Sequence, residues 1–320
     1  MPDLDRRRLL QAACLAPFVA PPLATALAQP VRRQHRPGMT AEEVTRGIDL
    51  TGMTALVTGC NSGIGLETMR VLALRGAHVI GTARTMERGR AACDSVKGRA
   101  TPVLLDLSDF PGVVECSRRV AALADSNSID ILVCNAGIVL GKPEQVHGIE
   151  KQFVVNHLGH YLLVRRLLPQ VTAAPQGRVV VLGSGDHRNA PPGGIQFDDL
   201  GGTTWPRRGY SHSKLANGLF SLELSKRLAA TKATSNCVTP GHTRTNILRD
   251  VGNGYRDDAR TVEQGAAPPC FVATAPELAK VSGQYFSDFA VAGQADAQRD
   301  AAMARRLWQV SEDLVRDHLG

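Results

Sequence analysis

The sequence Thr58-Gly59-Cys60-Asn61-Ser62-Gly63-Ile64-Gly65 stands between an apolar run at residues 53–57 and a helix-like pattern at residues 66–72. An apolar strand that enters a helix through a glycine-rich turn is typical of a phosphate-binding site. Glycine permits the tight turn and lets a phosphate reach backbone N–H groups, and the helix N-terminus adds about half a positive charge. The stretch therefore predicts a bound dinucleotide, although such a turn can also need glycine for structural reasons alone. The candidate binding residues in it are Gly59, Asn61, Ser62, Gly63, Ile64 and Gly65.

The composition excludes several classes of protein. A chain of 320 residues, 43% of them apolar, can bury the core of one catalytic domain. The net charge of +7 is uneven, because residues 1–38 hold six Arg and two Asp and so contribute +4, which leaves +3 for the remainder. That remainder has no basic run with interleaved aromatics, which argues against a nucleic-acid partner. The seven cysteines include no C-x-x-C pair, and we interpret them as small core residues, neither disulfides nor metal ligands.

The first 28 residues look like an export signal. Arg6-Arg7-Arg8-Leu9-Leu10 precedes an apolar segment at residues 12–27, which ends in the cleavage-site pattern Ala26-Leu27-Ala28. The segment resembles a bacterial twin-arginine signal, which predicts a periplasmic protein with a linker over residues 29–46. Its three prolines make it too broken for a stable membrane span. If the chain instead starts at Met39, the leader has no function and the protein is cytoplasmic.

Apolar strand-like runs alternate with helix-length amphipathic runs over residues 47–320. This alternation predicts right-handed βαβ crossovers, and hence an α/β fold with a doubly wound parallel sheet, the Rossmann fold. We expect a single three-layer α/β/α domain with its ligand at the carboxyl ends of the strands. The predicted strands cover residues 54–58, 78–83, 101–105, 129–134, 178–182, 234–238 and 284–286. The predicted helices cover residues 64–74, 110–124, 148–168 and 211–230.

Two long stretches that contain glycine and proline interrupt this alternation, at residues 186–209 and 242–269. Both follow a predicted strand, so both begin at the edge of the sheet where the ligand is expected. We interpret them as the walls of a substrate pocket. Pro268-Pro269 should delay or kink any helix that forms at the end of the second stretch.

Three side chains can carry acid–base chemistry. Tyr210 and Lys214 lie four residues apart on one face of a predicted helix, where an ammonium would lower the pKa of a phenol. The same spacing also occurs as an ordinary surface contact. Ser184 follows the strand at residues 178–182, where its hydroxyl can donate to a carbonyl oxygen or simply cap a turn. Asn135-Ala136-Gly137 ends another strand, and its small residues leave room for a flat cofactor.

Taken in order along the chain, these motifs resemble the short-chain dehydrogenase/reductase family. The matching elements are the glycine-rich turn, Leu105-Asp106-Leu107, Asn135-Ala136-Gly137, Asn156, Ser184, Tyr210 with Lys214, and Pro240-Gly241 with Thr243. Stretches at residues 155–163, 211–217, 285–288 and 306–308 narrow the resemblance to the branch that contains retinol dehydrogenases and WW-domain oxidoreductases. The resemblance covers about residues 46–319.

The resemblance implies a role for each matching residue. Tyr210 would be the general acid–base, Lys214 would lower its pKa and bind the nicotinamide ribose, and Ser184 would orient the substrate carbonyl. Asn156 would interrupt its helix and hold a water that relays protons past Lys214 to solvent. The other residues implied in cofactor binding are Asp106 at the adenine, Thr243 at the carboxamide, and Leu107, Asn135, Ala136, Gly137, Pro240 and Gly241.

The end of the second predicted strand favours NADP(H) over NAD(H). A carboxylate there would accept a hydrogen bond from the adenosine ribose 2′-hydroxyl, whereas a guanidinium suits a 2′-phosphate. Thr82-Ala83-Arg84 carries one arginine and no carboxylate. Arg84 could also be an ordinary exposed residue at the start of a helix.

The predicted function is an oxidoreductase that transfers a hydride between NADP(H) and an apolar alcohol, aldehyde or ketone, without a metal. The alternative is a dinucleotide-binding redox sensor or scaffold with little turnover. Such a protein would not need all of Asn156, Ser184, Tyr210 and Lys214, and all four are present. The sequence leaves the substrate, the reaction direction and the choice between homodimer and monomer open.

Overall fold

Strand β1 (Thr54–Val57) leads into the glycine-rich turn from the interior of the central sheet of this computed structural model. The structure describes residues 35–248 and 257–320, and His35–Gly320 form one compact unit. The further strands are β2 (His78–Ala83), β3 (Ala100–Leu104), β4 (Ile131–Cys134), β5 (Gln145–Val146), β6 (Ile149–Glu150), β7 (Arg178–Leu182), β8 (Thr234–Thr239), β9 (Tyr285–Ser287) and β10 (Ala290–Val291). Within the described residues, eight of them form one sheet in the order β10-β9-β8-β7-β4-β1-β2-β3, and β5 pairs with β6.

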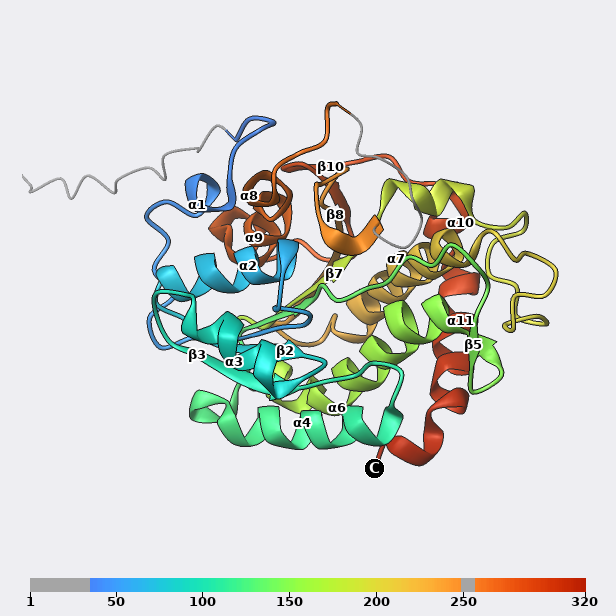
Figure 1. Ribbon diagram of the computed structural model, residues 1–320, viewed down its shortest axis with the longest axis horizontal. Coiled ribbons are helices and arrows are strands. Elements are labelled where there is room, and N and C mark those ends of the chain that lie inside the picture. The colour runs from blue at the N-terminus through green and yellow to red at the C-terminus, as the bar shows by residue number, and fades with distance from the viewer. Residues whose placement is uncertain (1–34, 249–256) are drawn as a thin grey trace, which may run out of the picture. The chain divides into compact units, whose positions relative to one another are not determined.

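Helices cover both faces of this sheet (Figure 1). One face carries α2 (Gly63–Leu74), α3 (Met86–Asp94) and α9 (Ala267–Thr274), and the other carries α4 (Phe110–Leu123), α6 (Gly159–Ala173) and α7 (Gly209–Arg227). Helix α11 (Ala301–Leu314) packs on α7 and buries Leu307 and Trp308. The short helices are α1 (Ala41–Val44), α5 (Lys151–Phe153), α8 (Val262–Gly265) and α10 (Asp296–Arg299).

The strand side chains alternate between two hydrophobic clusters, one on each face of the sheet. In β1, Ala55 and Val57 belong to the cluster with α2 and α9, whereas Leu56 belongs to the cluster with α4 and α6. In β7, Val179 and Val181 join that second cluster. Because a parallel strand in such a fold is covered on both faces, nearly every position along it is apolar.

The predicted α/β fold with a doubly wound parallel sheet is confirmed. From β1 the chain builds the sheet outward through β2 and β3, and it then crosses back to place β4 on the other side of β1. The strand order therefore reverses between the neighbours β1 and β4, and their carboxyl ends open a crevice there. Strand β10 departs from the parallel pattern, since it pairs antiparallel with β9. The strands predicted at residues 78–83 and 178–182 are found with the same bounds, as β2 and β7.

Two predicted elements differ from the structure. The continuous helix predicted from the residue pattern over residues 148–168 is interrupted, as the resemblance implied for Asn156, because α5 is followed by a π-helical turn at Val154–Leu158 before α6 begins. The loop expected over residues 242–269 contains α8 and the start of α9. Pro268 and Pro269 lie in the first turn of α9, where a helix tolerates proline because the N–H groups there have no intrahelical acceptor.

The predicted leader, residues 1–28, lies outside the described residues, as do residues 29–34 of the expected linker. Ala41 and Val44 of that linker are buried in α1, which packs on α9. The domain boundaries stay a prediction. Among the described residues, all six cysteines are buried with free thiols, in agreement with their interpretation as core residues.

Candidate active site

One cleft of about 1740 Å³ opens where the carboxyl ends of the central strands meet. Pockets for one small molecule usually measure ~300–1,000 Å³, so this cleft is large enough for a dinucleotide together with a substrate. Every candidate from the sequence except Asn156 lines it. The lining candidates are Gly59, Asn61, Ser62, Gly63, Ile64, Gly65, Arg84, Asp106, Leu107, Asn135, Ala136, Gly137, Ser184, Tyr210, Lys214, Pro240, Gly241 and Thr243.

The glycine positions of the glycine-rich turn cannot accommodate side chains. Gly59 and Gly63 have φ angles of +72° and +59°, which residues with a Cβ rarely adopt. A Cβ on Gly65 would overlap the carbonyl oxygen of Gly59 and Nδ2 of Asn135. Ser62 begins α2 without a side-chain capping bond, which leaves the first N–H groups of that helix available to an anion. The turn therefore fits a phosphate group.

Thr58 and Asn135 join β1 to β4 beneath this turn. Asn135 Nδ2 donates to the Thr58 carbonyl oxygen at 2.7 Å. The Thr58 hydroxyl oxygen accepts hydrogen bonds from the N–H groups of Asn135 and Ala136, both at 2.9 Å. Thr58 is absent from the predicted site residues, and its place between the apolar strand and the first glycine is the signal that could have found it.

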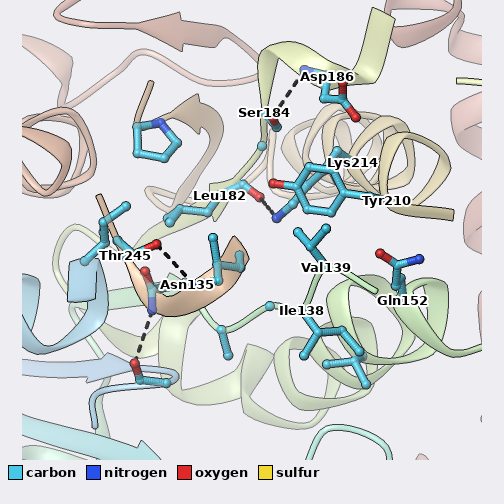
Figure 2. Close-up of a pocket in the computed structure, with 18 of the residues that line it drawn as sticks. Asn135, Ile138, Val139, Gln152, Leu182, Ser184, Asp186, Tyr210, Lys214 and Thr245 are labelled. Atoms are coloured by element: carbon cyan, nitrogen blue, oxygen red, sulfur yellow. Dashed lines mark hydrogen bonds between the residues drawn. The ribbon is translucent and has the colours of Figure 1, made fainter. Parts of the chain in front are cut away.

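Ser184, Tyr210 and Lys214 meet in the cleft (Figure 2). Ser184 follows β7, while Tyr210 and Lys214 lie one turn apart on α7. The Ser184 side chain acts on the Tyr210 phenol by lowering its pKa, and Ser184 Oγ accepts a hydrogen bond from the Asp186 N–H at 3.2 Å. Lys214 Nζ lies 5.5 Å from the centre of the Tyr210 ring and donates to the Leu182 carbonyl oxygen at 3.0 Å.

Burial dominates the electrostatics of these three side chains. It raises the pKa of Tyr210 to about 12, a shift that the Ser184 hydrogen bond opposes and the Asp186 charge reinforces. The lowered Tyr210 pKa expected from the sequence is therefore wrong for the protein without a ligand, because the nearby ammonium does not offset the loss of water around the phenol. Burial also lowers the pKa of Lys214 to about 8. At neutral pH the phenol keeps its proton.

Asn156 lies behind the cleft, fully buried in the π-helical turn. Its Oδ1 accepts from the Ile138 N–H at 2.8 Å, and its Nδ2 donates to the Ile138 carbonyl at 3.1 Å and to Ser213 Oγ at 3.0 Å. The helix interruption expected at Asn156 is present. Its side chain thus holds the loop after β4 against α7, and its role in a proton relay stays a prediction.

Two further polar residues line the cleft near Tyr210. Gln152 lies one turn before Asn156, and its Oε1 accepts from the Leu140 N–H at 3.0 Å, so it holds the same loop. Asp186 accepts a 2.5 Å hydrogen bond from the Ser211 hydroxyl. The four-residue spacing from Asn156 could have indicated Gln152. Asp186 lies at the start of the long stretch at residues 186–209, where no motif or spacing indicated it.

The other end of the cleft carries the groups that could meet an adenosine. Arg84 and Arg88 are exposed and both line it, Arg84 just after β2 and Arg88 in the first turn of α3. Asp106 Oδ1 accepts from the Ser108 N–H at 2.9 Å and from the Ser108 hydroxyl at 2.6 Å, which holds the turn after β3. Arg88 is not among the predicted residues, and its spacing from Arg84 is the signal that was missed.

Neither a metal site nor a membrane span is found among residues 35–248 and 257–320. No three His, Cys, Asp or Glu side chains of this part of the chain are grouped so that they could hold a metal ion. No helix in it is both long and apolar enough to cross a membrane.

Gly65→Ala should destabilise the protein, because its methyl group would overlap Gly59 and Asn135 in a turn tied to two strands. We expect the free energy of unfolding, measured by urea denaturation, to fall by ~1–3 kcal/mol. Gly293→Ala is the matched control, since nothing lies within 4 Å of a Cβ at that position. Equal stability of the two variants would contradict the packing argument.

Lys214→Met should change how stability depends on pH. The folded protein holds the pKa of Lys214 at about 8, against an ordinary value of 10.5. Between these values the unfolded chain binds more protons than the folded one, so the wild type should become more stable as pH rises. Relative to the Met variant, its free energy of unfolding should gain up to ~3 kcal/mol from pH 8 to 10.5. Urea denaturation across this range is the measurement. A stability difference between wild type and Met variant that stays constant with pH would refute the lowered pKa of Lys214.

Comparison with known proteins agrees with this geometry. Residues 53–256 match the family model described as short chain dehydrogenase. Human WW domain-containing oxidoreductase is 36% identical over 91% of this chain and 75% of its own length, and human retinol dehydrogenase 13 is 36% identical over 83% and 85%. The structure of an uncharacterized protein from Mycobacterium paratuberculosis has a TM-score of 0.71 at 30% identity, covering 85% of this chain and 97% of that one.

The predicted periplasmic localisation is contradicted by these relatives. The chloroplastic short-chain dehydrogenase TIC 32 B of Brassica napus is 36% identical over 86% of this chain and 92% of its own length. This similarity, like that to the human retinol dehydrogenase, gives no support to export by a twin-arginine signal. The residues read as that signal also lie outside the described part of the chain.

The family assignment rests on agreement between motif and geometry. The matched region holds the glycine-rich turn, Ser184, Tyr210 and Lys214, which lie in one cleft of a doubly wound sheet. Relatives at 36% identity extend the match over most of the chain. This chain belongs to the short-chain dehydrogenase/reductase family of oxidoreductases.

Proposed function

We propose that this protein interconverts an alcohol and its aldehyde or ketone, with NADP(H) as the second substrate and Tyr210 as the general acid–base. The observation that carries the proposal is the meeting of Ser184, Tyr210 and Lys214 in the same cleft as the phosphate-binding turn. A bound nicotinamide dinucleotide supplies or accepts the hydride in this chemistry. The residues of the chain supply binding, orientation and the proton.

In the reducing direction, Tyr210 donates its phenolic proton to the substrate oxygen. This step needs a protonated phenol, and burial keeps the pKa of Tyr210 well above neutral pH. The Ser184 hydroxyl donates to the same oxygen while negative charge develops on it. The Lys214 ammonium stabilises the phenolate left behind, at an Nζ-to-ring distance of 5.5 Å. In the oxidising direction the proton moves back to Tyr210.

Arg84 supports the choice of NADP(H). It is exposed just after β2 and lines the cleft, as does Arg88 in the first turn of α3. The end of β2 offers no carboxylate that could bind a ribose 2′-hydroxyl instead. Two guanidinium groups at this place would bind a 2′-phosphate through charge-assisted hydrogen bonds.

The walls of the cleft support a substrate with an apolar body. Val139, Leu140, Val155 and Ile247 line it, and Figure 2 shows Val139 on the side of the cleft that faces Tyr210. Apolar contacts would hold the body of the substrate while the polar groups at Tyr210 fix the reacting oxygen.

Tyr210→Phe should abolish turnover while the affinity for the dinucleotide stays nearly unchanged, because only the phenolic oxygen is lost. Oxidation and reduction of a panel of alcohols and carbonyls, followed by the absorbance of the reduced cofactor, measure turnover. Fluorescence titration with NADPH measures affinity. Tyr161→Phe is the control, since Tyr161 is buried between α6 and α11 and does not line the cleft. Retained activity in Tyr210→Phe would refute Tyr210 as the general acid–base. An inactive wild type that still binds NADPH would refute the enzyme in favour of a sensor.

Arg84→Ala should weaken NADPH binding by about tenfold or more through loss of a charge-assisted contact, and leave NADH binding within about twofold. Titration of both cofactors gives the ratio of their dissociation constants. Arg90→Ala is the control, because Arg90 is an exposed residue of α3 that does not line the cleft. A wild type that prefers NADH would overturn the assignment.

A further inference from the structure

We infer that His160 is a positioning residue, whose ring ties the floor of the dinucleotide site to the helical segment that carries Asn156. The inference rests on the proposed function, because it gives His160 an effect on a bound dinucleotide and on turnover. His160 lies in the stretch at residues 155–163 that carries the resemblance, but the resemblance implies no role for it, and it is buried behind the cleft without lining it.

The two ring nitrogens of His160 face different partners. Nδ1 lies 3.1 Å from the carbonyl oxygen of Asn156, and Nε2 lies 2.9 Å from Oγ1 of Thr58. A carbonyl oxygen can only accept a hydrogen bond, so Nδ1 carries the ring proton. In a neutral ring Nε2 is then an acceptor, which requires the Thr58 hydroxyl to donate.

The Thr58 hydroxyl independently leads to the same assignment. Its oxygen already accepts from the N–H groups of Asn135 and Ala136, both at 2.9 Å, which uses both of its lone pairs. Its single proton has two acceptors within reach, His160 Nε2 at 2.9 Å and the Val133 carbonyl oxygen at 3.4 Å. The shorter bond goes to the imidazole. Every donor and acceptor has a partner only when the ring is neutral and protonated at Nδ1.

A protonated ring would break this arrangement, because Nε2–H would point at an oxygen whose lone pairs are both occupied. Burial lowers the pKa of His160 to about 4, in agreement with a permanently neutral ring. His160 is therefore a fixed bridge at neutral pH, and it moves no proton in the reaction.

The bridge acts on two parts of the site. Thr58 precedes the first glycine of the phosphate-binding turn and holds the backbone of Asn135 and Ala136, which lines the cleft. The Asn156 segment, held from the other side of the ring, carries the amide that donates to Ser213, the residue before Lys214. Loss of the Thr58 bond should loosen the dinucleotide site, and loss of the Asn156 bond should disturb the surroundings of Lys214.

His157 offers a matched control on the same segment. It is also buried, and its Nε2 bonds to Ser311 Oγ on α11 at 2.8 Å. It does not line the cleft, and its hydrogen bond runs to α11, whereas the Thr58 hydroxyl meets Val133 and His160. Substitutions of His157 therefore perturb helix packing to a similar degree without cutting the bridge.

The experiment compares His160→Asn and His160→Gln with the same two substitutions of His157. An Asn amide reaches the position of Nδ1 and can keep the bond to Asn156, whereas a Gln amide reaches the position of Nε2 and can keep the bond to Thr58. Three quantities are measured in the full-length proteins. They are the dissociation constant of NADPH, kcat with the best carbonyl substrate of the wild type, and the hydrogen-exchange rates of the Asn135 and Ala136 amides.

We expect His160→Asn to raise the NADPH dissociation constant about tenfold and to speed exchange of both amides, with kcat within about twofold of the wild type. His160→Gln should show the reverse split, with kcat about tenfold lower and both NADPH affinity and amide exchange nearly unchanged. The inference is overturned if both His160 variants change the same quantity, either NADPH affinity or kcat, or if they behave like the His157 variants.

The amide exchange keeps this inference separate from the proposed function. If the wild type neither binds nor turns over NADPH or NADH, the proposed function fails. Faster exchange of Asn135 and Ala136 in His160→Asn alone would still support the bridge in that case, and unchanged exchange would overturn it.

Discussion

The close approach of β1 and β4 at their carboxyl ends is the constraint on which the rest of the site depends. Asn135 reaches back from β4 to the backbone of Thr58, and its amide occupies the space where a side chain on Gly65 would lie. The chain can leave β1 and enter α2 only through glycine, and the same tight turn exposes backbone N–H groups to the cleft. A single steric requirement thus produces both the packing of two strands and a place for a phosphate.

The chemistry of the site depends on a second constraint, the removal of water from charged groups. Tyr210 and Lys214 come from one helix, and burial shifts both of them toward their neutral forms. Asp186 adds to the shift of the phenol, while the Ser184 hydrogen bond acts against it. A neutral phenol beside a hydroxyl donor is the state that the proposed role of Tyr210 as a proton donor requires.

Much of this arrangement could be predicted from local patterns. The apolar runs at residues 78–83 and 178–182 are strands with those bounds, because strands covered on both faces need apolar residues throughout. Helices α3 and α11 were missed. The core of α3 is small, with only Gly89, Ala92 and Cys93 buried, so it carries little hydrophobic periodicity. Helix α11 is amphipathic, but it follows the last strand of the strand–helix alternation and packs on another helix, α7.

The order of the elements, the glycine-rich turn and the candidate reacting groups could be read from the sequence, since each depends on residue type and on spacing over a few positions. Tertiary structure alone decided the direction of the Tyr210 pKa shift, because desolvation depends on everything packed around the phenol. It also decided that Asn156 serves the loop at Ile138, and that His160 meets Thr58 across 102 positions of the chain. Contacts of that separation leave no periodic trace, and only the folded sheet brings their partners together.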